Sequence, residues 1–424
     1  MPSLSQLVKI AIVNRNYPPR TGITGESACQ LARYLETNTN AKVTVVSSRS
    51  DYAGGGADIE PVGDVRLIRS WYDGKNKLLR LFSSFLESYL LIRTARSTKP
   101  DRIIVMTDPP FLQFWAPLLL EGKCPWTLWS MDVYPDAFVS GNLVKPNNLA
   151  YRALHHLTYK NSPDSLITLG PLQGEYLRVA YRKPIEHVAV VPCGVYAKQD
   201  QPTAEPAWKK DSAGKILLGY CGNLGEAHSV EFLKQVINHF DPARYHMVLS
   251  VYGVKAQEIL DHARTKQTGI SITPRVEREH MHFIDIHLVS LMERWSHVCV
   301  PSKAVSAICS ESPILLYGTP DCDNWKMLGF GGWLIRQSSN PNDVSKAVRH
   351  FLDVMDHDAI ESKKRDASTV AASLQEMIEF GYYQLAKQIG LDHHPTEVRP
   401  PVPMPVPKTT GSGLLSKPSE LITD

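Results

Sequence analysis

The sequence lacks the patterns that mark several common protein classes. Its seven cysteines among 424 residues are odd in number, scattered, and form no C-x-x-C pair. This usage is typical of reduced thiols and argues against a disulfide framework or a zinc site. The formal net charge is only +3, so charge gives no indication of nucleic-acid binding.

Long hydrophobic runs are also absent. The longest, residues 109–120 (PPFLQFWAPLLL), contains Pro117 and is shorter than the ~20 residues that cross a bilayer. We expect it to form a buried helix, and residues 81–92 (LFSSFLESYLLI) to belong to the core. The N-terminus enters a strand pattern without the regions of a signal peptide. We therefore expect a cytoplasmic protein, and peripheral contact with the inner face of the membrane stays open.

A strand, a glycine-bearing turn and a helix occur twice, about two hundred residues apart. The first copy carries Gly22 and Gly25 before its helix, and the second carries Gly222 and Gly225. A turn that opens a helix presents free backbone N–H groups and a positive dipole end, which favour phosphate. The repetition predicts two nucleotide-fold domains that face each other across a cleft.

The alternation of short apolar runs with helical patterns predicts an α/β protein with two Rossmann-like parallel-sheet domains. The expected strands are residues 8–13, 42–47, 65–69, 102–106, 126–130, 165–169, 187–191, 215–220, 246–252, 284–290, 313–317 and 333–336. The expected helices are residues 26–36, 78–96, 148–160, 228–239, 256–265, 303–309, 341–355 and 360–389.

Composition shifts predict the domain limits. We expect an N-terminal domain over residues 1–197, a polar linker over 198–213 and a second domain over 214–375. Residues 376–392 should form a helix that crosses back to the first domain. Residues 393–424 are rich in Pro, Ser, Thr and Gly and should be disordered.

Several motifs follow the expected strands in a fixed order, at the carboxyl ends where α/β folds place ligands. They are YPP-x(2)-GITG, TDPP and WSMDVYPD in the first half, then GYCGNLGEAH, IDIHLVSL and VPSKAVSAICSESPILL. Together they resemble the GT-B glycosyltransferases, in particular the family-4 branch that builds bacterial surface polysaccharides. The resemblance covers roughly residues 8 to 390.

The resemblance implies transfer of a sugar from a nucleotide-sugar donor to a glycan or lipid-linked acceptor, with retention at the anomeric carbon. The donor would lie mainly on the second domain and the acceptor on the first. No cofactor is expected, and helix N-termini, Lys and Arg would stabilise the leaving diphosphate without a metal. The D-x-D spacing of Asp321 and Asp323 lies in an Asp/Asn-rich segment that indicates a turn.

Individual residues take roles from this resemblance. The donor-binding candidates are Gly22, Gly25, Gly222, Asn223, Gly225, Ser302, Lys303 and Ser306. His228 would contact the donor sugar, and Asp132 would orient or deprotonate the acceptor hydroxyl. Each has a structural alternative: a capping turn for the glycines, a solvated surface position for Lys303 and His228, and a turn for Asp132.

One departure from the family matters. The wider family carries two glutamates at positions that correspond to Val298 and Ser306. A serine cannot offer a bidentate carboxylate to ribose hydroxyls. The usual glycine before the proline at position 313 is also missing. Donor affinity, donor identity or activity itself would change as a result.

Two other functions therefore remain open. One is a GT-B module with weakened catalysis that acts as a binding or scaffold protein, with the Pro-rich tail as a docking segment. The other is an NADP-dependent oxidoreductase in which Arg49 meets the 2′-phosphate, although neither turn has the G-x-G-x-x-G triple. His280, His282 and His287 match no usual zinc spacing.

Overall fold

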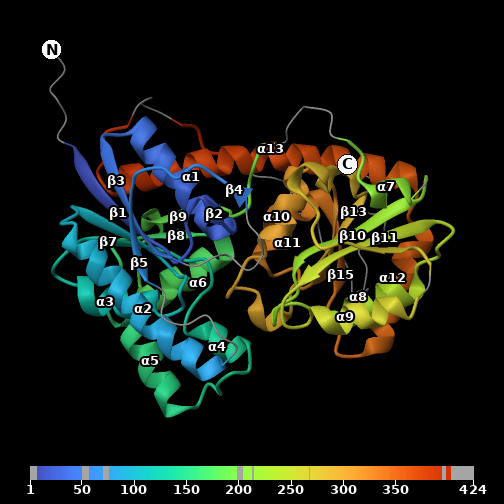
Figure 1. Ribbon diagram of the computed structural model, residues 1–424, viewed down its shortest axis with the longest axis horizontal. Coiled ribbons are helices and arrows are strands. Elements are labelled where there is room, and N and C mark those ends of the chain that lie inside the picture. Colours follow the sequence, from blue (N-terminus) through green and yellow to red (C-terminus); the bar gives the residue numbers. More distant parts are fainter. Residues whose placement is uncertain are drawn as a thin grey trace. The chain divides into compact units, whose positions relative to one another are not determined.

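The chain folds into two compact units. The computed structural model describes residues 7–49, 57–69, 76–197, 204–212, 214–266, 268–393 and 398–402. Unit 1 is built from Met1–Cys193, His297–Val300 and Met377–Pro400. Unit 2 contains Gly194–Ser296 and Pro301–Glu376. Each unit has its own parallel sheet (Figure 1).

Unit 1 is organised around a seven-stranded parallel sheet of order β5-β3-β1-β6-β7-β8-β9. The strands are β1 (Val8–Val13), β3 (Ala41–Arg49), β5 (Asp64–Arg69), β6 (Arg102–Met106), β7 (Trp126–Trp129), β8 (Ser165–Thr168) and β9 (Val188–Val190). β2 (Arg20–Thr21) and β4 (Ala57–Asp58) form a small antiparallel pair. The central strands β6, β7 and β8 are buried almost throughout, which explains their continuous apolar sequences.

Helices connect the strands of unit 1. They are α1 (Ile23–Asn38), α2 (Lys77–Ser97), α3 (Leu112–Leu120), α4 (Asp136–Ser140), α5 (Leu149–Lys160), α6 (Pro171–Tyr181) and the 3₁₀ turn η1 (Ile185–His187). The predicted helix at residues 109–120 is confirmed as α3, with Leu112 and Leu120 fully buried.

Unit 2 contains a six-stranded parallel sheet of order β12-β11-β10-β13-β14-β15. The strands are β10 (Ile216–Asn223), β11 (Tyr245–Tyr252), β12 (Ile270–Ile272), β13 (Ile286–Ser290), β14 (Ile314–Gly318) and β15 (Gly332–Arg336). Its helices are α7 (Ala207–Lys210), α8 (Val230–His239), α9 (Ala256–Arg264), α10 (Ser302–Cys309), α11 (Asp323–Leu328) and α12 (Pro341–Val354). Short 3₁₀ turns are η2 (Arg278–Phe283), η3 (Glu293–Trp295) and η4 (Gly329–Gly331).

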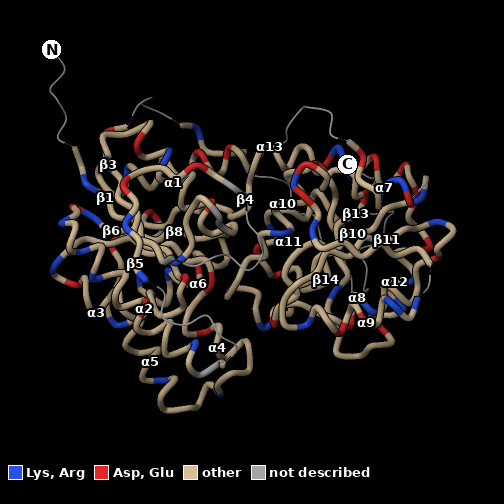
Figure 2. The backbone as a smooth tube through the Cα atoms, viewed as in Figure 1, with Lys and Arg blue, Asp and Glu red and all other residues tan. Residues whose placement is uncertain are grey.

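Unit 2 has a well-packed core. Phe232 of α8 stacks on Tyr317 of β14 with ring centroids 5.1 Å apart, and Trp333 of β15 meets Phe351 of α12 edge to face. The interior strands carry few charged residues, which lie mainly on helices and loops (Figure 2). The predicted α/β class with two parallel sheets is confirmed.

The last helix, α13 (His357–Gln388), belongs to both units. Its residues up to Glu376 group with unit 2, and those from Met377 onward group with unit 1. In unit 1 the helix packs closely on β9 at Gly381. A Cβ added there would lie only 2.4 Å from the carbonyl oxygen of Val190. Tyr382, Leu385 and Ala386 are buried there.

Three expectations from the sequence need correction. The segment 198–213 is not a continuous linker, since residues 207–210 form α7. Trp208 supplies the reason: it is buried against Leu217 and Ile284. The helix expected from residue 228 begins at Val230, because the Ser229 side chain accepts a hydrogen bond from Phe232 N and caps it.

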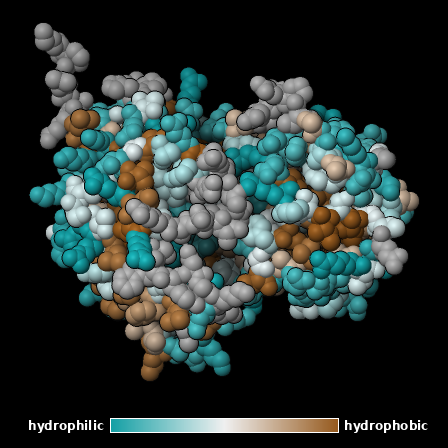
Figure 3. Space-filling model, in the orientation of Figure 1, coloured by the Kyte–Doolittle hydropathy of each residue, from teal (hydrophilic) through white to brown (hydrophobic). Residues whose placement is uncertain are grey.

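The third correction concerns residues 81–92, which are not all core. Leu91 and Ile92 are fully buried, but Leu81 and Phe82 are 43% and 62% exposed. The helix places these residues on different faces, so only part of the apolar run reaches the sheet. Hydrophobic atoms are visible on the surface of unit 1 in Figure 3.

None of the helices in the described ranges has the length and apolarity needed to cross a membrane. Most of the tail expected to be disordered, residues 394–397 and 403–424, lies outside the described residues, as do residues 198–203 of the expected linker.

Candidate functional site

In unit 2, the predicted glycine turn lies at the carboxyl end of β10. Gly222 has a φ of +121°, and a Cβ there would meet nothing within 4 Å. The backbone conformation at position 222 therefore favours glycine. No atom occupies the space that a side chain would fill there. Gly225 lies in the following turn and accepts a hydrogen bond from His228 N, so α8 itself starts only at Val230.

Lys303 reaches this turn from α10. Its Nζ donates to the Tyr220 hydroxyl and to the Asn223 carbonyl, both at 2.6 Å, and lies 4.4 Å from the centre of the Tyr220 ring. Asn223 and Lys303 belong to two motifs that lie eighty residues apart in the sequence. The structure brings the two together, and the ammonium adds positive charge to a loop of backbone N–H groups.

His228 follows the same turn and is buried. Its Nδ1 must carry the proton, since it donates to the carbonyl oxygen of Ser290. Burial, together with the charges of Lys303 and Lys255, holds the pKa of His228 well below its usual value. The ring is thus neutral, and its Nε2 offers a lone pair as a hydrogen-bond acceptor.

Ser302 and Ser306 lie one turn apart on α10, next to Gly194. The Ser306 hydroxyl is buried and donates to the Gly194 carbonyl at 3.0 Å. Gly194 has a φ of +90°, and a Cβ there would lie 2.9 Å from Ser306 Oγ and 3.2 Å from Ser302 Cβ. Ser306 therefore makes a packing contact with Gly194, and its hydroxyl is engaged by that carbonyl.

The end of α10 explains the missing glycine before Pro313. Glu311 N donates to Ile308 O and Ser312 N donates to Ala307 O, which is the Schellman arrangement. Glu311 occupies the left-handed position of this motif with a φ of +60°. The backbone keeps the conformation for which glycine is the usual residue, and Glu311 bears the strain.

In unit 1, Gly22 is the N-cap of α1, and Gly25 lies in the first helical turn and is buried. The first backbone N–H groups of this helix donate no hydrogen bond to a side chain at the N-cap, because Gly22 has none. The prediction that this glycine turn opens a helix is confirmed. Its contact with phosphate stays a prediction.

Asp132 follows β7 and lies beside the segment His297–Val300. Its backbone N–H donates to Thr107 Oγ1, and Asp132 forms an isolated β-bridge with Cys299. The carboxylate itself has no hydrogen-bond partner among the described residues. Burial, and then the charge of Asp108, raises the pKa of Asp132 to about 6. An unpartnered carboxyl with this pKa suits proton exchange near neutral pH.

Asp136, the second aspartate of the WSMDVYPD motif, has a different environment. It accepts hydrogen bonds from the hydroxyls of Tyr159 at 2.8 Å and Tyr176 at 2.7 Å. His155 Nε2 lies 3.7 Å from it. Asp136 therefore fixes α4, α5 and α6 to one another, and Asp132 is the better candidate for chemistry.

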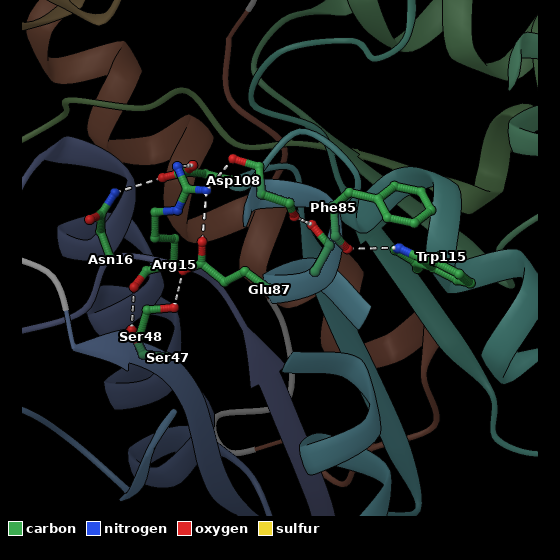
Figure 4. A network of polar contacts seen from close by, with 10 residues as sticks. Arg15, Asn16, Ser47, Ser48, Phe85, Glu87, Asp108 and Trp115 are labelled. Carbon is green, nitrogen blue, oxygen red and sulfur yellow. Dashed lines mark hydrogen bonds and ion pairs between the residues drawn. The ribbon is translucent and has the colours of Figure 1, made fainter. Parts of the chain in front are cut away.

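A polar network adjoins Asp108 in the TDPP motif (Figure 4). Arg15 donates to Glu87 of α2 at 3.0 Å and lies 3.4 Å from Asp108 Oδ1. Asn16 donates to the other oxygen of Asp108 at 2.6 Å. Burial raises the pKa of Asp108, whereas Arg15 opposes that change. The network holds the carboxyl ends of β1 and β6 together next to Asp132.

Sequence reasoning missed Arg15, Glu87 and Asp108 as individual residues. Asp108 lies in the TDPP motif, and Arg15 lies two residues after the first strand. The available signal was Glu87, a lone acid in an apolar helix, since a buried carboxylate requires a partner.

The positions of the two family glutamates lie in different surroundings. Val298 belongs to unit 1, is buried, and accepts a hydrogen bond from Val133 N at 2.8 Å, directly after Asp132. Ser306 belongs to unit 2 and packs on Gly194 as described above. A carboxylate is absent from both positions.

The three histidines of residues 280–287 do not converge. His287 is buried, and its Nε2 pairs with the carbonyl oxygen of Met281. Burial lowers the pKa of His287 to about 4, so the ring is neutral. Within the described part of the chain, no group of three or more His, Cys, Asp or Glu residues has an arrangement that would hold a metal ion.

Several known proteins resemble this chain in sequence or in fold. No protein-family model matches the sequence. A curated protein named "Probable glycosyltransferase WbjE", from Pseudomonas aeruginosa, is 25% identical over 277 residues, which cover 61% of this chain and 68% of that protein.

Solved structures have the same fold. WaaG, a glycosyltransferase involved in lipopolysaccharide biosynthesis, aligns with a TM-score of 0.61 and 14% identity over 88% of this chain and 98% of its own. Anabaena HepE in complex with UDP-glucose gives 0.59 and 13% over 90% and 99%. Sucrose-phosphate synthase from Thermosynechococcus elongatus gives 0.63 and 12% over 90% and 98%. The GT-B fold and the resemblance to glycosyltransferases are confirmed.

Proposed function

We propose that this protein transfers a sugar from a nucleotide-sugar donor to a hydroxyl of a glycan or lipid-linked acceptor, in surface polysaccharide synthesis. The resemblance to WbjE and the GT-B fold support the transferase activity. The UDP-glucose complex of HepE supports a nucleotide-sugar as donor. The involvement of WaaG in lipopolysaccharide biosynthesis supports a surface glycan as product.

The observation that carries the proposal is the contact of Lys303 with the Gly222–Gly225 turn. As the sugar leaves, negative charge grows on the diphosphate. The ammonium of Lys303 and the open backbone at Gly222 are positioned to stabilise that charge. We expect this charge stabilisation to need no metal ion and no cofactor.

His228 would then bind the donor sugar. Because its Nδ1 is engaged with Ser290 and the ring stays neutral, Nε2 accepts a hydrogen bond from a sugar hydroxyl. A protonated imidazolium could not accept a hydrogen bond from the sugar. Burial keeps the ring neutral and so makes His228 Nε2 the acceptor in this contact.

Asp132 would act on the acceptor. Among the described residues its carboxylate has no hydrogen-bond partner, and its pKa of about 6 leaves it ionised at neutral pH. It can accept the hydrogen bond of an acceptor hydroxyl and raise the nucleophilicity of that oxygen. In a reaction with retention, the acceptor oxygen would approach from the face of the sugar from which the diphosphate leaves.

The test combines binding with a matched pair of variants. Titration calorimetry with UDP-, GDP- and ADP-sugars should identify one donor class, with NADPH as the comparison for an oxidoreductase. Lys303→Ala should weaken donor affinity at least several-fold, because it removes a charge-assisted contact. Lys303→Arg should retain part of it. Lys346→Ala, an exposed lysine of α12, serves as the control.

The outcomes separate the competing functions. Equal donor affinity in Lys303→Ala would remove Lys303 from the site. Donor binding without transfer to any glycan or lipid-linked acceptor would favour the weakened scaffold module. Binding of NADPH alone would favour the oxidoreductase. NMR of the product's anomeric proton, compared with that of the donor, tests retention.

A further inference from the structure

The outer face of α5 in unit 1 has no role in the proposed reaction. Leu149 and Leu157 on this face are 79% and 36% exposed, and Leu143 in the preceding loop is 70% exposed. Large apolar side chains gathered on one exposed helix face are unusual on the surface of a soluble monomeric protein.

The opposite face of α5 packs on unit 1, and this fixes which way the leucines point. Thr158 is buried, and together with Leu154 it lines an apolar recess with Phe111 and Phe138. Residues 149, 152, 153, 156, 157 and 160 follow the i, i+3, i+4 spacing of a single helix face. That face is turned away from the core.

Charge on this surface has one sign. Residues 137–163 contain no Asp or Glu, and Lys145, Arg152 and Lys160 are exposed. In Figure 2, α5 carries Lys or Arg positions and no Asp or Glu. Basic residues thus lie between exposed leucines.

The start of α2 has the same character. Leu79, Leu81 and Phe82 are 51%, 43% and 62% exposed, and Arg80 between them is exposed too. The acid of α2, Glu87, is buried and paired with Arg15, so it adds no charge to the surface. Because α3 packs against both α2 and α5, the two helices lie on the same side of unit 1 (Figure 1).

We propose that the exposed residues of α5, its preceding loop and the start of α2 dock the protein on an anionic phospholipid bilayer. Apolar side chains would enter the interface while Lys and Arg meet the phosphates, the pattern of interfacial helices. A second copy of the chain fits poorly, because it would bring the same basic residues against each other. Docking stands independently of transfer, but with the proposed function it brings the enzyme to a lipid-linked acceptor.

Vesicle sedimentation of the full chain tests the proposal. The protein should sediment with vesicles of phosphatidylcholine and phosphatidylglycerol, more weakly with phosphatidylcholine alone, and less at high salt. The double variant Leu149→Gln/Leu157→Gln should lower the partition coefficient at least about fivefold, since less apolar surface enters the interface. Val179→Gln on α6, which is 60% exposed, is the matched control and should change nothing.

A second pair tests the charges. Arg152→Gln/Lys160→Gln should weaken binding to the anionic vesicles and reduce its salt dependence, whereas Lys346→Gln should not. All the altered positions are exposed. Near-ultraviolet circular dichroism checks that each variant is folded.

Three results would overturn the proposal: no sedimentation of the unaltered protein, sedimentation unaffected by the α5 variants, or a dimer in analytical ultracentrifugation that Leu149→Gln/Leu157→Gln abolishes. The last would assign the face to a second copy. Donor affinity, measured by calorimetry, should be equal in all these variants. Loss of docking is therefore distinguishable from a failure of the proposed function.

Discussion

Asp132 and Asp108 differ in their partners although both follow strands of one sheet. Arg15 and Asn16 hold Asp108, while the Asp132 carboxyl is unpartnered among the described residues and has its pKa raised to about 6. Because burial and the charge of Asp108 disfavour its ionised form, the protonation of Asp132 changes closer to neutral pH than that of an ordinary aspartate.

The pH dependence of transfer should report this carboxyl. If the ionised form is required, kcat/KM should fall as the pH decreases through about 6. Asp108→Asn removes the neighbouring charge, so the pKa of Asp132 should decrease and the inflection should move to lower pH. A pH–rate profile of both proteins checks this. An inflection that Asp108→Asn leaves in place would contradict the assignment.

The same shift has a consequence for stability with a definite sign. The folded-state pKa of Asp132 is raised above the usual aspartate value of 3.8, so its contribution to stability is present at low pH and is lost as the pH rises through about 6. Asp132→Asn should therefore be inactive yet more stable than the parent protein at pH 7.5. Chemical denaturation at pH 4 and 7.5 would show the difference.

Glu311 offers a second prediction for a single residue. Replacement by glycine should raise the free energy of unfolding by about 0.5–1 kcal/mol, because the left-handed conformation costs glycine nothing. Glu311→Ala retains the strain and removes the contact with Ser368, so it should not stabilise. Urea denaturation distinguishes them, and equal stability of the two variants would contradict the argument.

At the scale of elements, the network at Arg15 joins β1, β3, α2 and β6. Ser47 and Ser48 of β3 both donate hydrogen bonds to the Arg15 carbonyl, and Ser48 also donates to Glu87. Glu87 is 2% exposed. A buried carboxylate depends on its cationic partner, so these four elements should lose stability together if Arg15 is changed.

Arg15→Met should accordingly destabilise the protein by about 3 kcal/mol or more, because it leaves Glu87 buried without its ion pair. The double variant Arg15→Met/Glu87→Met should recover much of that loss, since the uncompensated charge is gone. Denaturant unfolding of both, in a double-mutant cycle, measures the coupling. Additive effects would show that the two residues do not interact.

The sequence predicted most of these elements because parallel strands buried on both faces are continuous apolar runs. β1 and β6 have the predicted bounds, and most others differ by a few residues. It missed the helices α4, α6, α7 and α11 and the strand β12. In α7, four residues give no periodicity and only Trp208 marks the burial. Asn223 and Lys303 were named as donor-binding candidates from the family resemblance, and the structure places the two in contact. The Arg15–Glu87 pair was not named, because no local pattern records a contact 72 residues apart.

For the whole molecule, α13 is the element that both units share. Tyr382, Leu385 and Ala386 are buried in unit 1, and Val370 and Leu374 are buried earlier in the same helix. The chain therefore completes the core of its first unit with residues from near its end. Folding of unit 1 should depend on synthesis of the chain as far as residue 388.

Two truncations test this dependence. A chain that ends after residue 402 should keep its melting temperature, because the Pro-, Ser- and Gly-rich composition of the removed segment offers little to a core. A chain that ends after residue 376 should lose the cooperative unfolding of unit 1, because it lacks the buried side chains of Tyr382, Leu385, Ala386, Ile389 and Leu391. Calorimetry checks both, and a large decrease for the shorter deletion would contradict the first expectation.

The contact between Ser306 and Gly194 restricts which sequences this protein can reach by single changes. The Ser306 hydroxyl is buried and donates to the Gly194 carbonyl, and a Cβ on Gly194 would lie 2.9 Å from that hydroxyl oxygen, so the two positions are in direct contact. A carboxylate at position 306 would face the Gly194 carbonyl oxygen, which cannot donate a hydrogen bond, so Ser306→Glu alone should be destabilising. The side chain at position 306 is therefore coupled to the backbone at position 194.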